Sequence, residues 1–267
     1  MKLLSISFAT LLNPITTFAL AAEPSKTTNR SRILDLVENG VTERTSRGPA
    51  AVHGTQNWSG GVATNVAFYS VHVDMTIPEL RLPEGGDPST LYGLSAWVGI
   101  DGTDYCPSDM LQTGVDMYLK NGVATYIPWF QWYPGNHMYL RDTIITAGDT
   151  VRLSVGTSPR DMSRYFFTVS NYRTGGESRM ETNNTHVLLC GFTTEFIVED
   201  FWNTDRLPLV DFGNIKFTST ISEVEGGIAG GMEGLKLLEV EEEGTERKPI
   251  HCTNDGVTLS CDYQTSN

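Results

Sequence analysis

The sequence predicts an all-β domain in which two antiparallel sheets pack face to face. Short runs rich in Val, Ile, Thr, Phe and Tyr recur from Val62 onward, and their hydrophobic residues alternate with period two. Gly, Asp, Asn and Pro separate the runs at spacings that suit an antiparallel sandwich. The runs do not alternate with helical patterns, so a parallel α/β fold is not expected.

Individual segments support this interpretation in chain order. The clearest strand runs are residues 151–155, 164–172 and 195–201, and the candidate turns are 84–87, 121–122 and 147–149. Only residues 232–243 invite a helix assignment, and their acidic end favours a solvated loop instead. We therefore expect a single domain over residues 55–267, without an internal repeat or a linker.

Composition indicates a well-packed protein with an acidic surface. Of the 267 residues, 39% are hydrophobic and 10% aromatic, which is enough apolar surface for a core and excludes wholesale disorder. Acidic residues number 32 against 19 basic ones, so the net charge is −13. Phosphate backbones require Lys and Arg to replace their counterions, so a nucleic-acid partner is not expected.

The N-terminal residues predict secretion. Residues 1–22 begin with Lys2, continue with an apolar stretch and end in small residues, as signal peptides do. Asn13 and Pro14 interrupt the stretch, which is too short to span a membrane. We therefore expect a soluble, extracellular protein that does not associate with membranes. A buried N-terminal helix is the alternative interpretation.

A change of charge follows the signal segment. Residues 23–54 are slightly basic, whereas residues 51–267 hold 13 basic and 28 acidic residues, a net charge of −15. We predict that residues 23–54 form a removable pro-segment that binds the domain before maturation; a disordered N-terminal arm is the alternative. The crowded carboxylates of the mature domain repel one another at neutral pH, so we expect its stability to fade as the pH rises.

Four cysteines in a secreted chain are expected to pair as disulfides. Cys252 and Cys261 flank a hairpin-like stretch, so a local bridge joins them naturally, which leaves Cys106 with Cys190. Zinc is the alternative, but no pair has Cys-x-x-Cys spacing. The candidate N-glycosylation sequons begin at Asn57 and Asn183.

Several common catalytic patterns are missing from the sequence. The five histidines are scattered without the spacing of a metal site, and residues 93–97 lack the second glycine of a serine nucleophile elbow. The glycines of 226–231 are not followed by Lys and Ser or Thr, so they do not form a phosphate-binding loop. We expect neither a metal nor a cofactor.

Polar side chains instead lie among aromatic residues in three strand-like regions: 97–102 with 111–116, 129–134 and 195–201. Alternation places Glu195, Ile197 and Glu199 on one sheet face, and it likewise places Trp129, Gln131 and Tyr133 together. Such a face, with amides and carboxyls among aromatic rings, suits an extended polymer lying in a groove.

These regions carry a family resemblance. They read Trp-Val-Gly-Ile-Asp-Gly (97–102), Leu-Gln-Thr-Gly (111–114), Trp-x-x-Trp-Tyr-Pro (129–134) and Glu-Phe-Ile-Val-Glu-Asp-Phe (195–201). In this order they resemble the glutamic endopeptidases of the eqolisin type, pepstatin-insensitive acid proteases of fungi. The resemblance extends over residues 57–263. It implies a jelly-roll-like (concanavalin-like) sandwich, a bridge between Cys106 and Cys190, and protein or peptide substrates. A monomer suits such an enzyme.

By its motif positions, the resemblance implies that Gln112 and Glu199 form the catalytic pair. Glu199 would take a proton from the attacking water and return it to the leaving nitrogen, while Gln112 would orient the water and donate to the oxyanion. The residues expected to contact substrate or support the cleft are Trp58, Trp97, Asp101, Asp116, Gln131 and Tyr133. Gln131 departs from the family, which commonly has Glu there, so the pKa of Glu199 and the subsite preference are expected to differ.

Two other functions fit a sandwich with a groove. In a glycoside hydrolase, Glu195 and Glu199 would act as acid and nucleophile, but Ile197 stands where such strands usually carry Asp. The other possibility is a non-catalytic, lectin-like carbohydrate-binding module. Digestion of a denatured protein at acid pH and binding to a glycan array distinguish the three hypotheses.

Overall fold

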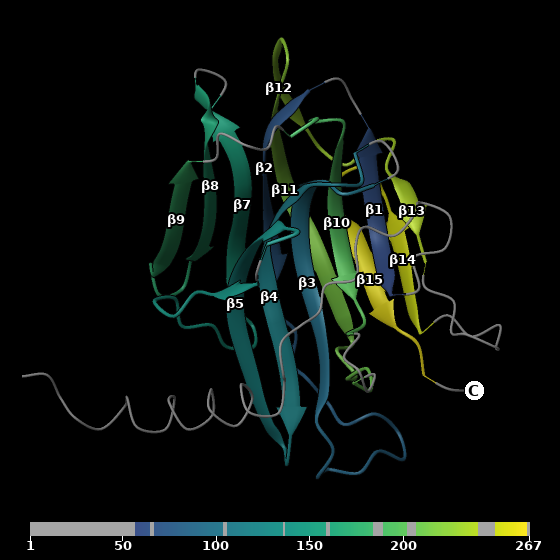
Figure 1. Cartoon of the computed structure of the whole chain (residues 1–267). Coiled ribbons are helices and arrows are strands. Elements are labelled where there is room, and N and C mark those ends of the chain that lie inside the picture. The colour runs from purple at the N-terminus through teal and green to yellow at the C-terminus, as the bar shows by residue number, and fades with distance from the viewer. Residues whose placement is uncertain are drawn as a thin grey trace, which may run out of the picture. The chain divides into compact units, whose positions relative to one another are not determined.

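A computed structural model describes eight segments of the chain (Figure 1). They are residues 57–64, 67–103, 106–135, 137–158, 161–183, 189–201, 207–239 and 249–265. The predicted signal peptide (1–22) and pro-segment (23–54) lie outside them. Within the described segments, no helix has the length and hydropathy needed to cross a membrane.

The described chain folds into two antiparallel sheets, which confirms the predicted all-β sandwich. The seven-stranded sheet contains, in spatial order, β13 (Lys236–Leu238), β1 (Trp58–Thr64), β10 (Thr193–Glu199), β3 (Tyr92–Asp101), β4 (Met110–Lys120), β5 (Val123–Tyr133) and β6 (Met138–Tyr139). The eight-stranded sheet contains β14 (Ile250–Asn254), β15 (Leu259–Tyr263), β11 (Asn214–Val224), β2 (Phe68–Thr76), β7 (Thr150–Ser158), β8 (Asp161–Asn171) and β9 (Glu177–Asn183), with β12 (Gly227–Gly230) paired to β11.

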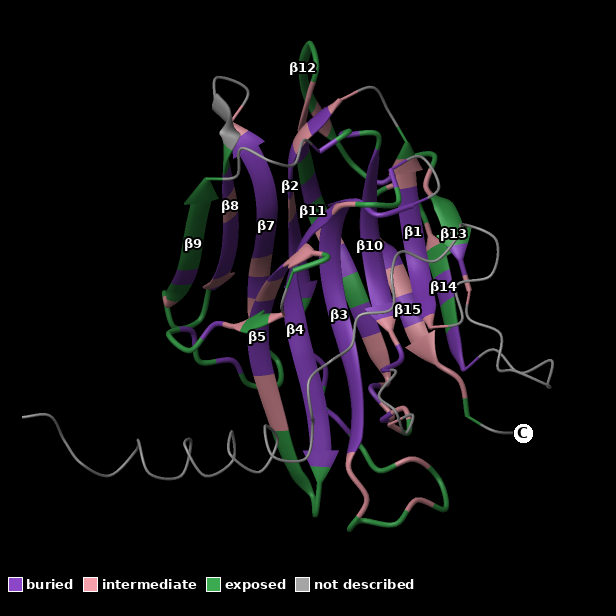
Figure 2. Cartoon of the chain, in the orientation of Figure 1, coloured by how far each residue is buried: buried purple, intermediate pink, exposed green. Residues whose placement is uncertain are grey.

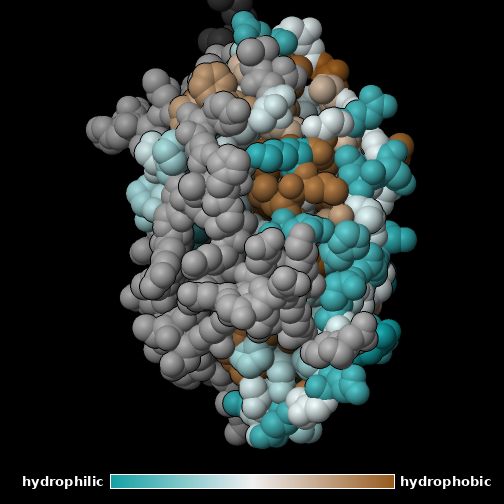
Figure 3. Space-filling model, turned by 90° about the vertical axis from the view of Figure 1, so that its right-hand side faces the viewer, coloured by the Kyte–Doolittle hydropathy of each residue, from teal (hydrophilic) through white to brown (hydrophobic). Residues whose placement is uncertain are grey.

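The main core lies between the two sheets, and side-chain alternation explains it. Phe196 and Val198 of β10 point into this core, whereas Ile197 packs on the outer face of the seven-stranded sheet. Strands β3, β4 and β10 are buried over nearly their whole length, while β9 and β12 are largely exposed (Figure 2). Viewed from the side of β13 and β14, the described surface is mostly hydrophilic, and hydrophobic residues form limited patches (Figure 3).

The predicted turns are present, and a short strand lies within the segment that invited a helix assignment. Asn121 and Gly122 both have positive φ and join β4 to β5 in a two-residue turn. Residues 236–238 form β13, because the backbone of Lys236–Leu238 pairs with Gly60–Val62 of β1. β13 ends directly before the acidic end of residues 232–243, for which a solvated loop is predicted; residues 240–243 lie outside the described segments.

Both expected disulfides form. Cys252 and Cys261 face each other across the β14–β15 hairpin, and Cys106 is bonded to Cys190 over a separation of 84 residues. Next to the Cys106–Cys190 bridge, the Asp101 carboxylate accepts hydrogen bonds from the backbone N–H groups of Gly191 and Phe192, at 2.8 and 2.9 Å. The bridge and these bonds hold the chain that enters β10.

A second carboxyl group, that of Glu195, is fully buried on the outer face of β10. Neither of its oxygens makes a hydrogen bond of normal geometry to the described residues, and the nearby Thr193 hydroxyl pairs with that of Thr103. Burial raises the pKa of Glu195 well above its usual range, and the charge of Asp101 raises it further, whereas the Thr193 hydroxyl lowers it. Burial also raises the pKa of Asp101, although its backbone donors oppose this shift.

Removing the long-range disulfide should destabilise the fold more than removing the local one. Cys106→Ser with Cys190→Ser frees a loop of 84 residues, for which the chain-entropy model gives on the order of 4 kcal/mol. Cys252→Ser with Cys261→Ser frees one of 9 residues, for which the model gives about 3 kcal/mol. Urea unfolding at pH 4 measures both losses. A greater loss for the Cys252–Cys261 pair would contradict this interpretation.

The buried Glu195 should limit stability at neutral pH. Because its folded-state pKa is raised, its contribution is present below the unfolded pKa and is lost as the pH rises through the folded pKa. Glu195→Gln keeps the shape without the charge. We expect equal free energies of unfolding at pH 3, and a gap in favour of the variant that grows toward pH 7.5 by up to about 1.4 kcal/mol per pH unit.

Urea unfolding across this pH range measures the gap. Glu225→Gln, at an exposed position, is the control that removes the same charge from the surface. The interpretation fails if the free energies of unfolding of wild type and Glu195→Gln differ by the same amount at every pH. It also fails if Glu225→Gln gives an equal gap, because burial of Glu195 would then not be what lowers stability at neutral pH.

Candidate active site

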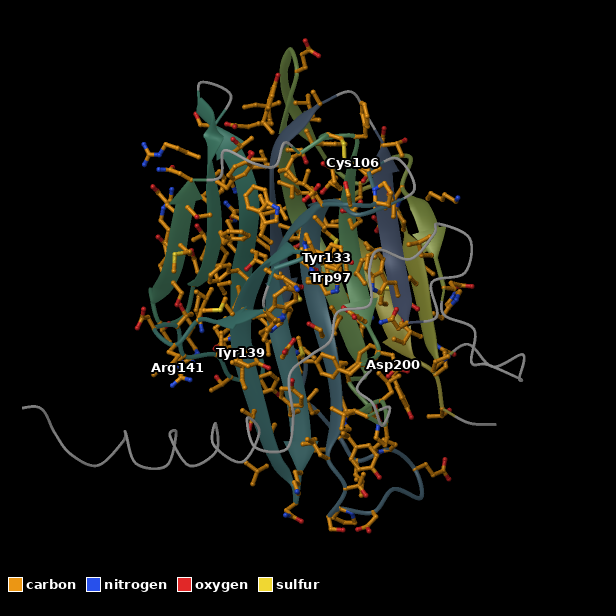
Figure 4. All side chains as sticks on the ribbon, in the orientation of Figure 1. Trp97, Cys106, Tyr133, Tyr139, Arg141 and Asp200 are labelled. Carbon is orange, nitrogen blue, oxygen red and sulfur yellow. A yellow bond between two sulfur atoms is a disulfide. The ribbon has the colours of Figure 1, made fainter. Side chains whose placement is uncertain are left out.

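The outer face of the seven-stranded sheet carries a second cluster of buried side chains. Its members are Trp58, Val62, Trp97, Met110, Trp129, Ile197 and Leu238, with Tyr133 and Tyr139 packed against them. Figure 4 labels Trp97 of β3 and Tyr133, the last residue of β5. The predicted placement of Trp129, Gln131 and Tyr133 on one face is therefore confirmed, since the intervening Phe130 and Trp132 pack against the main core.

Glu199 ends β10 on this outer face, where two side-chain donors hold its carboxylate. The indole Nε1 of Trp97 donates to Oε2 at 2.8 Å, and Nδ2 of Asn57 donates to Oε1 at 3.0 Å. The backbone carbonyl of Asn57 accepts from the Asp200 N–H at 2.9 Å, which fixes Asn57 beside the end of β10. The carboxylate is therefore held in one orientation while it remains half-buried.

The position of Trp97 depends on a glycine. Trp97 of β3 pairs with Gly114 of β4, and a Cβ atom at residue 114 would lie 2.5 Å from both the Trp97 Cβ and the Ala96 carbonyl oxygen. The absence of that atom leaves room for Trp97 beside β4, and its indole reaches Glu199 on β10. On its other side, Trp58 meets Trp97 edge to face, with ring centroids 4.8 Å apart.

Gln112 lies on the same face, on β4, and its side chain is 5% exposed. Its Nε2 donates to Oε1 of Gln131 at 2.8 Å, and Nε2 of Gln131 donates to the Gly135 carbonyl at 2.8 Å. Two amides are thus linked in a chain that ends on a backbone carbonyl. Such a chain fixes which end of each amide faces which neighbour.

The sheet register relates Gln112 to Glu199. Gln112 lies opposite Gly99, and Glu199 lies opposite Ser95, so the two residues occupy rows on either side of the row that contains Trp97 and Gly114. A carboxylate and a carboxamide therefore flank the Trp97 indole diagonally on one face. Each has a dedicated partner: Trp97 for Glu199 and Gln131 for Gln112.

Two of the residues predicted to contact substrate or support the cleft are fully buried aspartates. Asp101 is fully buried at the end of β3 and binds the backbone beside the Cys106–Cys190 disulfide. Asp116 is also fully buried; its carboxylate accepts from the Ser95 hydroxyl at 2.7 Å and from the Tyr139 hydroxyl at 3.3 Å. These hydrogen bonds agree with the supporting role predicted for both aspartates, and their contact with substrate stays a prediction.

The other predicted residues line or support the outer face. Trp58 lies opposite Glu199 and packs on Trp97. Tyr133 is partly exposed at the end of β5, whereas Gln131 is only 3% exposed. Gln131 contacts Gln112 directly through a hydrogen bond, and its contact with substrate stays a prediction.

Sequence reasoning missed Asn57 and His137 as parts of this face. Asn57 was noticed only as a glycosylation sequon, but its Nδ2 binds Glu199 and the sequon's Ser59 is fully buried. We therefore expect Asn57 to carry no glycan, whereas Asn183 is exposed. His137 stacks near Trp129, with ring centroids 4.4 Å apart, and its Nε2 lies 3.5 Å from Asp116. No local pattern in the sequence signals either contact.

The burial of Glu195 disfavours the glycoside hydrolase hypothesis. Its carboxyl group is fully buried and would need to reach a sugar as catalytic acid. Among the described residues, one group has the proximity that a metal site needs, namely Asp101, Cys106 and Cys190. Its two cysteines form a disulfide, so they offer no thiolate to a metal ion.

Comparisons with known proteins agree on one family. The model of the Peptidase A4 family matches residues 56–263. Aspergillopepsin-2 of Aspergillus niger is 30% identical over 222 residues, which cover 77% of each chain. Scytalidopepsin B of Scytalidium lignicola is 30% identical over 215 residues, which cover 78% of this chain and 77% of that protein.

Solved structures give the same result. Scytalido-glutamic peptidase with a peptide-based transition state analog matches with a TM-score of 0.66 and 28% identity, over 78% of this chain and 98% of that one. Aspergilloglutamic peptidase from Aspergillus niger matches with a TM-score of 0.58 and 32% identity, over 65% of this chain and 99% of that one.

Proposed function

The chain belongs to the Peptidase A4 family and is a glutamic peptidase, and we propose that it cleaves proteins at acid pH by means of a Glu199–Gln112 dyad. The observation that carries this proposal is the diagonal arrangement of the two side chains on one sheet face. Each is held by its own partner, and Trp97 lies between their rows. The motifs predict no other carboxylate–carboxamide pair as the catalytic residues.

In the proposed reaction, Glu199 is a carboxylate when the peptide binds. It accepts a proton from a water molecule as the water oxygen attacks the scissile carbonyl carbon. The C–N bond of the resulting tetrahedral intermediate then breaks, and Glu199 returns the proton to the leaving nitrogen. The hydrogen bonds from Trp97 and Asn57 hold the carboxylate on the outer face of the sheet, where the water would be activated.

Gln112 does not titrate, so its proposed role is to donate and accept hydrogen bonds. One N–H of its amide is used by Gln131, and the second can donate to the oxyanion as negative charge develops there. Its carbonyl oxygen can accept from the attacking water. Because Gln131 orients the amide before substrate binds, little reorganisation is needed during the reaction.

The peptide is proposed to lie on the outer face, between Trp58 and Tyr133. Two solved relatives hold peptide-like ligands, one a peptide-based transition state analog and the other the tripeptide Ala-Ile-His, which supports a peptide as the ligand. Aromatic side chains provide flat apolar contacts for an extended peptide. We therefore propose that Trp58 and Tyr133 contact the substrate directly.

Secretion, maturation and an acid working pH belong to the same proposal. The signal-like N-terminus and the two disulfides support an extracellular location. The net charge of −15 beyond residue 50, together with the buried Glu195, supports greater stability in acid than at neutral pH. The enzyme would act as a monomer after loss of residues 23–54.

Glu199→Gln should abolish proteolysis while leaving a folded protein. The amide has nearly the same shape but cannot accept the proton of the water, so we expect kcat to fall by at least about 10³-fold. The assay is digestion of a denatured protein at pH 3, with and without pepstatin. Glu225→Gln is the matched surface control. Retained activity in Glu199→Gln would overturn the dyad, and sugar binding on a glycan array without proteolysis would favour the lectin alternative.

Gly114→Ala should disturb the dyad without changing either catalytic residue. The added Cβ atom must displace Trp97, so the indole loses its hydrogen bond to Glu199. We expect kcat to fall by about 10-fold or more, because the loss of a charge-assisted hydrogen bond costs roughly 1.5–3 kcal/mol. Gly230→Ala is the control, since its nearest contact is 3.5 Å away. Wild-type kcat in Gly114→Ala would refute this role of Trp97.

A further inference from the structure

We propose that Gln131 is a positioning residue, which fixes the amide of Gln112 in its catalytic orientation and keeps it there at every pH at which the enzyme works. This inference rests on the proposed function. It concerns the buried amide that contacts Gln112 directly, at 2.8 Å.

The orientation follows from the donors and acceptors in the chain of bonds. A backbone carbonyl oxygen only accepts, so the Gly135 carbonyl requires Nε2 of Gln131 at 2.8 Å. Oε1 of Gln131 then faces Gln112, and this oxygen also only accepts, so Gln112 must present Nε2 to it. The carbonyl oxygen of Gln112 is thereby turned away from Gln131.

The Gly135 residue, whose carbonyl anchors these hydrogen bonds, is itself held in place. The N–H of Gly135 donates to the Trp132 carbonyl at 2.6 Å, which closes a turn directly after β5. Gln112 and Gln131 lie opposite each other in the β4–β5 register and are 5% and 3% exposed. A flipped Gln112 amide would bring two oxygens together in a buried position, so the flip loses a hydrogen bond and adds a repulsion.

A glutamate at residue 131 can serve in only one of its two protonation states. As a neutral acid it repeats the pattern of the amide, because its O–H donates to Gly135 and its carbonyl accepts from Gln112. As a carboxylate it has no donor, and one oxygen then faces the Gly135 carbonyl. The amide of Gln131 has no such ionisation, so it makes the alignment of Gln112 independent of pH.

The surroundings make this distinction important. The row of Gln131 continues through Gln112 and Gly99 to Glu195, and the neighbouring elements carry Glu199, Asp101, Asp116 and His137. Tyr133 and Tyr139 pack on the same face. A carboxylate at residue 131 would join four acids and one histidine in a largely buried region, so like-charge repulsion would oppose its ionisation.

The test compares Gln131→Glu and Gln131→Met with wild type. The measurement is kcat and KM for a peptide substrate between pH 2.5 and 6. For Gln131→Glu, we expect a kcat close to wild type in the most acidic range, where residue 131 is protonated. As residue 131 ionises, the wild-type to variant ratio should rise by up to about tenfold per pH unit.

Gln131→Met has similar volume but neither hydrogen bond. We expect its kcat to be lower by about tenfold at every pH, with little change in KM, because Gln112 acts mainly in the transition state. A purely structural role for Gln131 predicts a pH-independent ratio for both variants, and that result would overturn the proposal. Gln264→Glu, on the far sheet beyond β15, is the control for an added charge and should give a flat ratio.

A second readout does not depend on activity. The side-chain amide of Gln112 can be followed by ¹⁵N NMR and assigned by its absence in Gln112→Glu. We expect an additional titration step of this signal in Gln131→Glu that is not seen when residue 131 is Gln. If wild type proves inactive, the proposed function fails and this readout alone decides: the additional step supports the positioning role, and identical titration curves refute it.

Discussion

The hydrogen bond from the Trp97 indole to the Glu199 carboxylate is the interaction on which the site depends. It joins two strands, β3 and β10, at a distance of 2.8 Å, between residues 102 positions apart. The bond forms because the sheet register places Trp97 one row from Glu199 and because Gly114 leaves room for the indole. The position of the carboxylate is therefore a property of the whole seven-stranded sheet.

The central strands of this sheet are buried on both faces, and this imposes a second constraint. A polar group placed there needs a partner, since an unpaired buried polar atom costs about 1–3 kcal/mol. Gln112, Asp101 and Asp116 all meet this requirement through defined hydrogen bonds. Glu195 avoids the cost of a buried charge in another way, because burial raises its pKa and favours the uncharged carboxyl group. The same burial that organises the site therefore makes the fold suited to acid.

The sequence predicted the parts of this structure that depend on local pattern. Period-two alternation predicted that Glu195, Ile197 and Glu199 share one face. The motif resemblance predicted Gln112 and Glu199 as the catalytic pair. The contact between Asn57 and Glu199 was not predictable, since it joins residues 142 positions apart through strand register. The backbone partners of Asp101 and of β13 were not predictable for the same reason, because each depends on which distant backbone groups lie opposite.

The central claim is that Glu199 and Gln112 act together on one scissile peptide bond. A crystal structure of the protein with a peptide analogue that carries a tetrahedral centre tests it most directly. We predict one oxygen of that centre within about 3 Å of Gln112 Nε2 and another within about 3 Å of the Glu199 carboxylate, with Gln131 still bonded to Gln112. A tetrahedral centre bound nearest to another carboxyl group, such as that of Asp116, with Gln112 out of reach, would contradict the account.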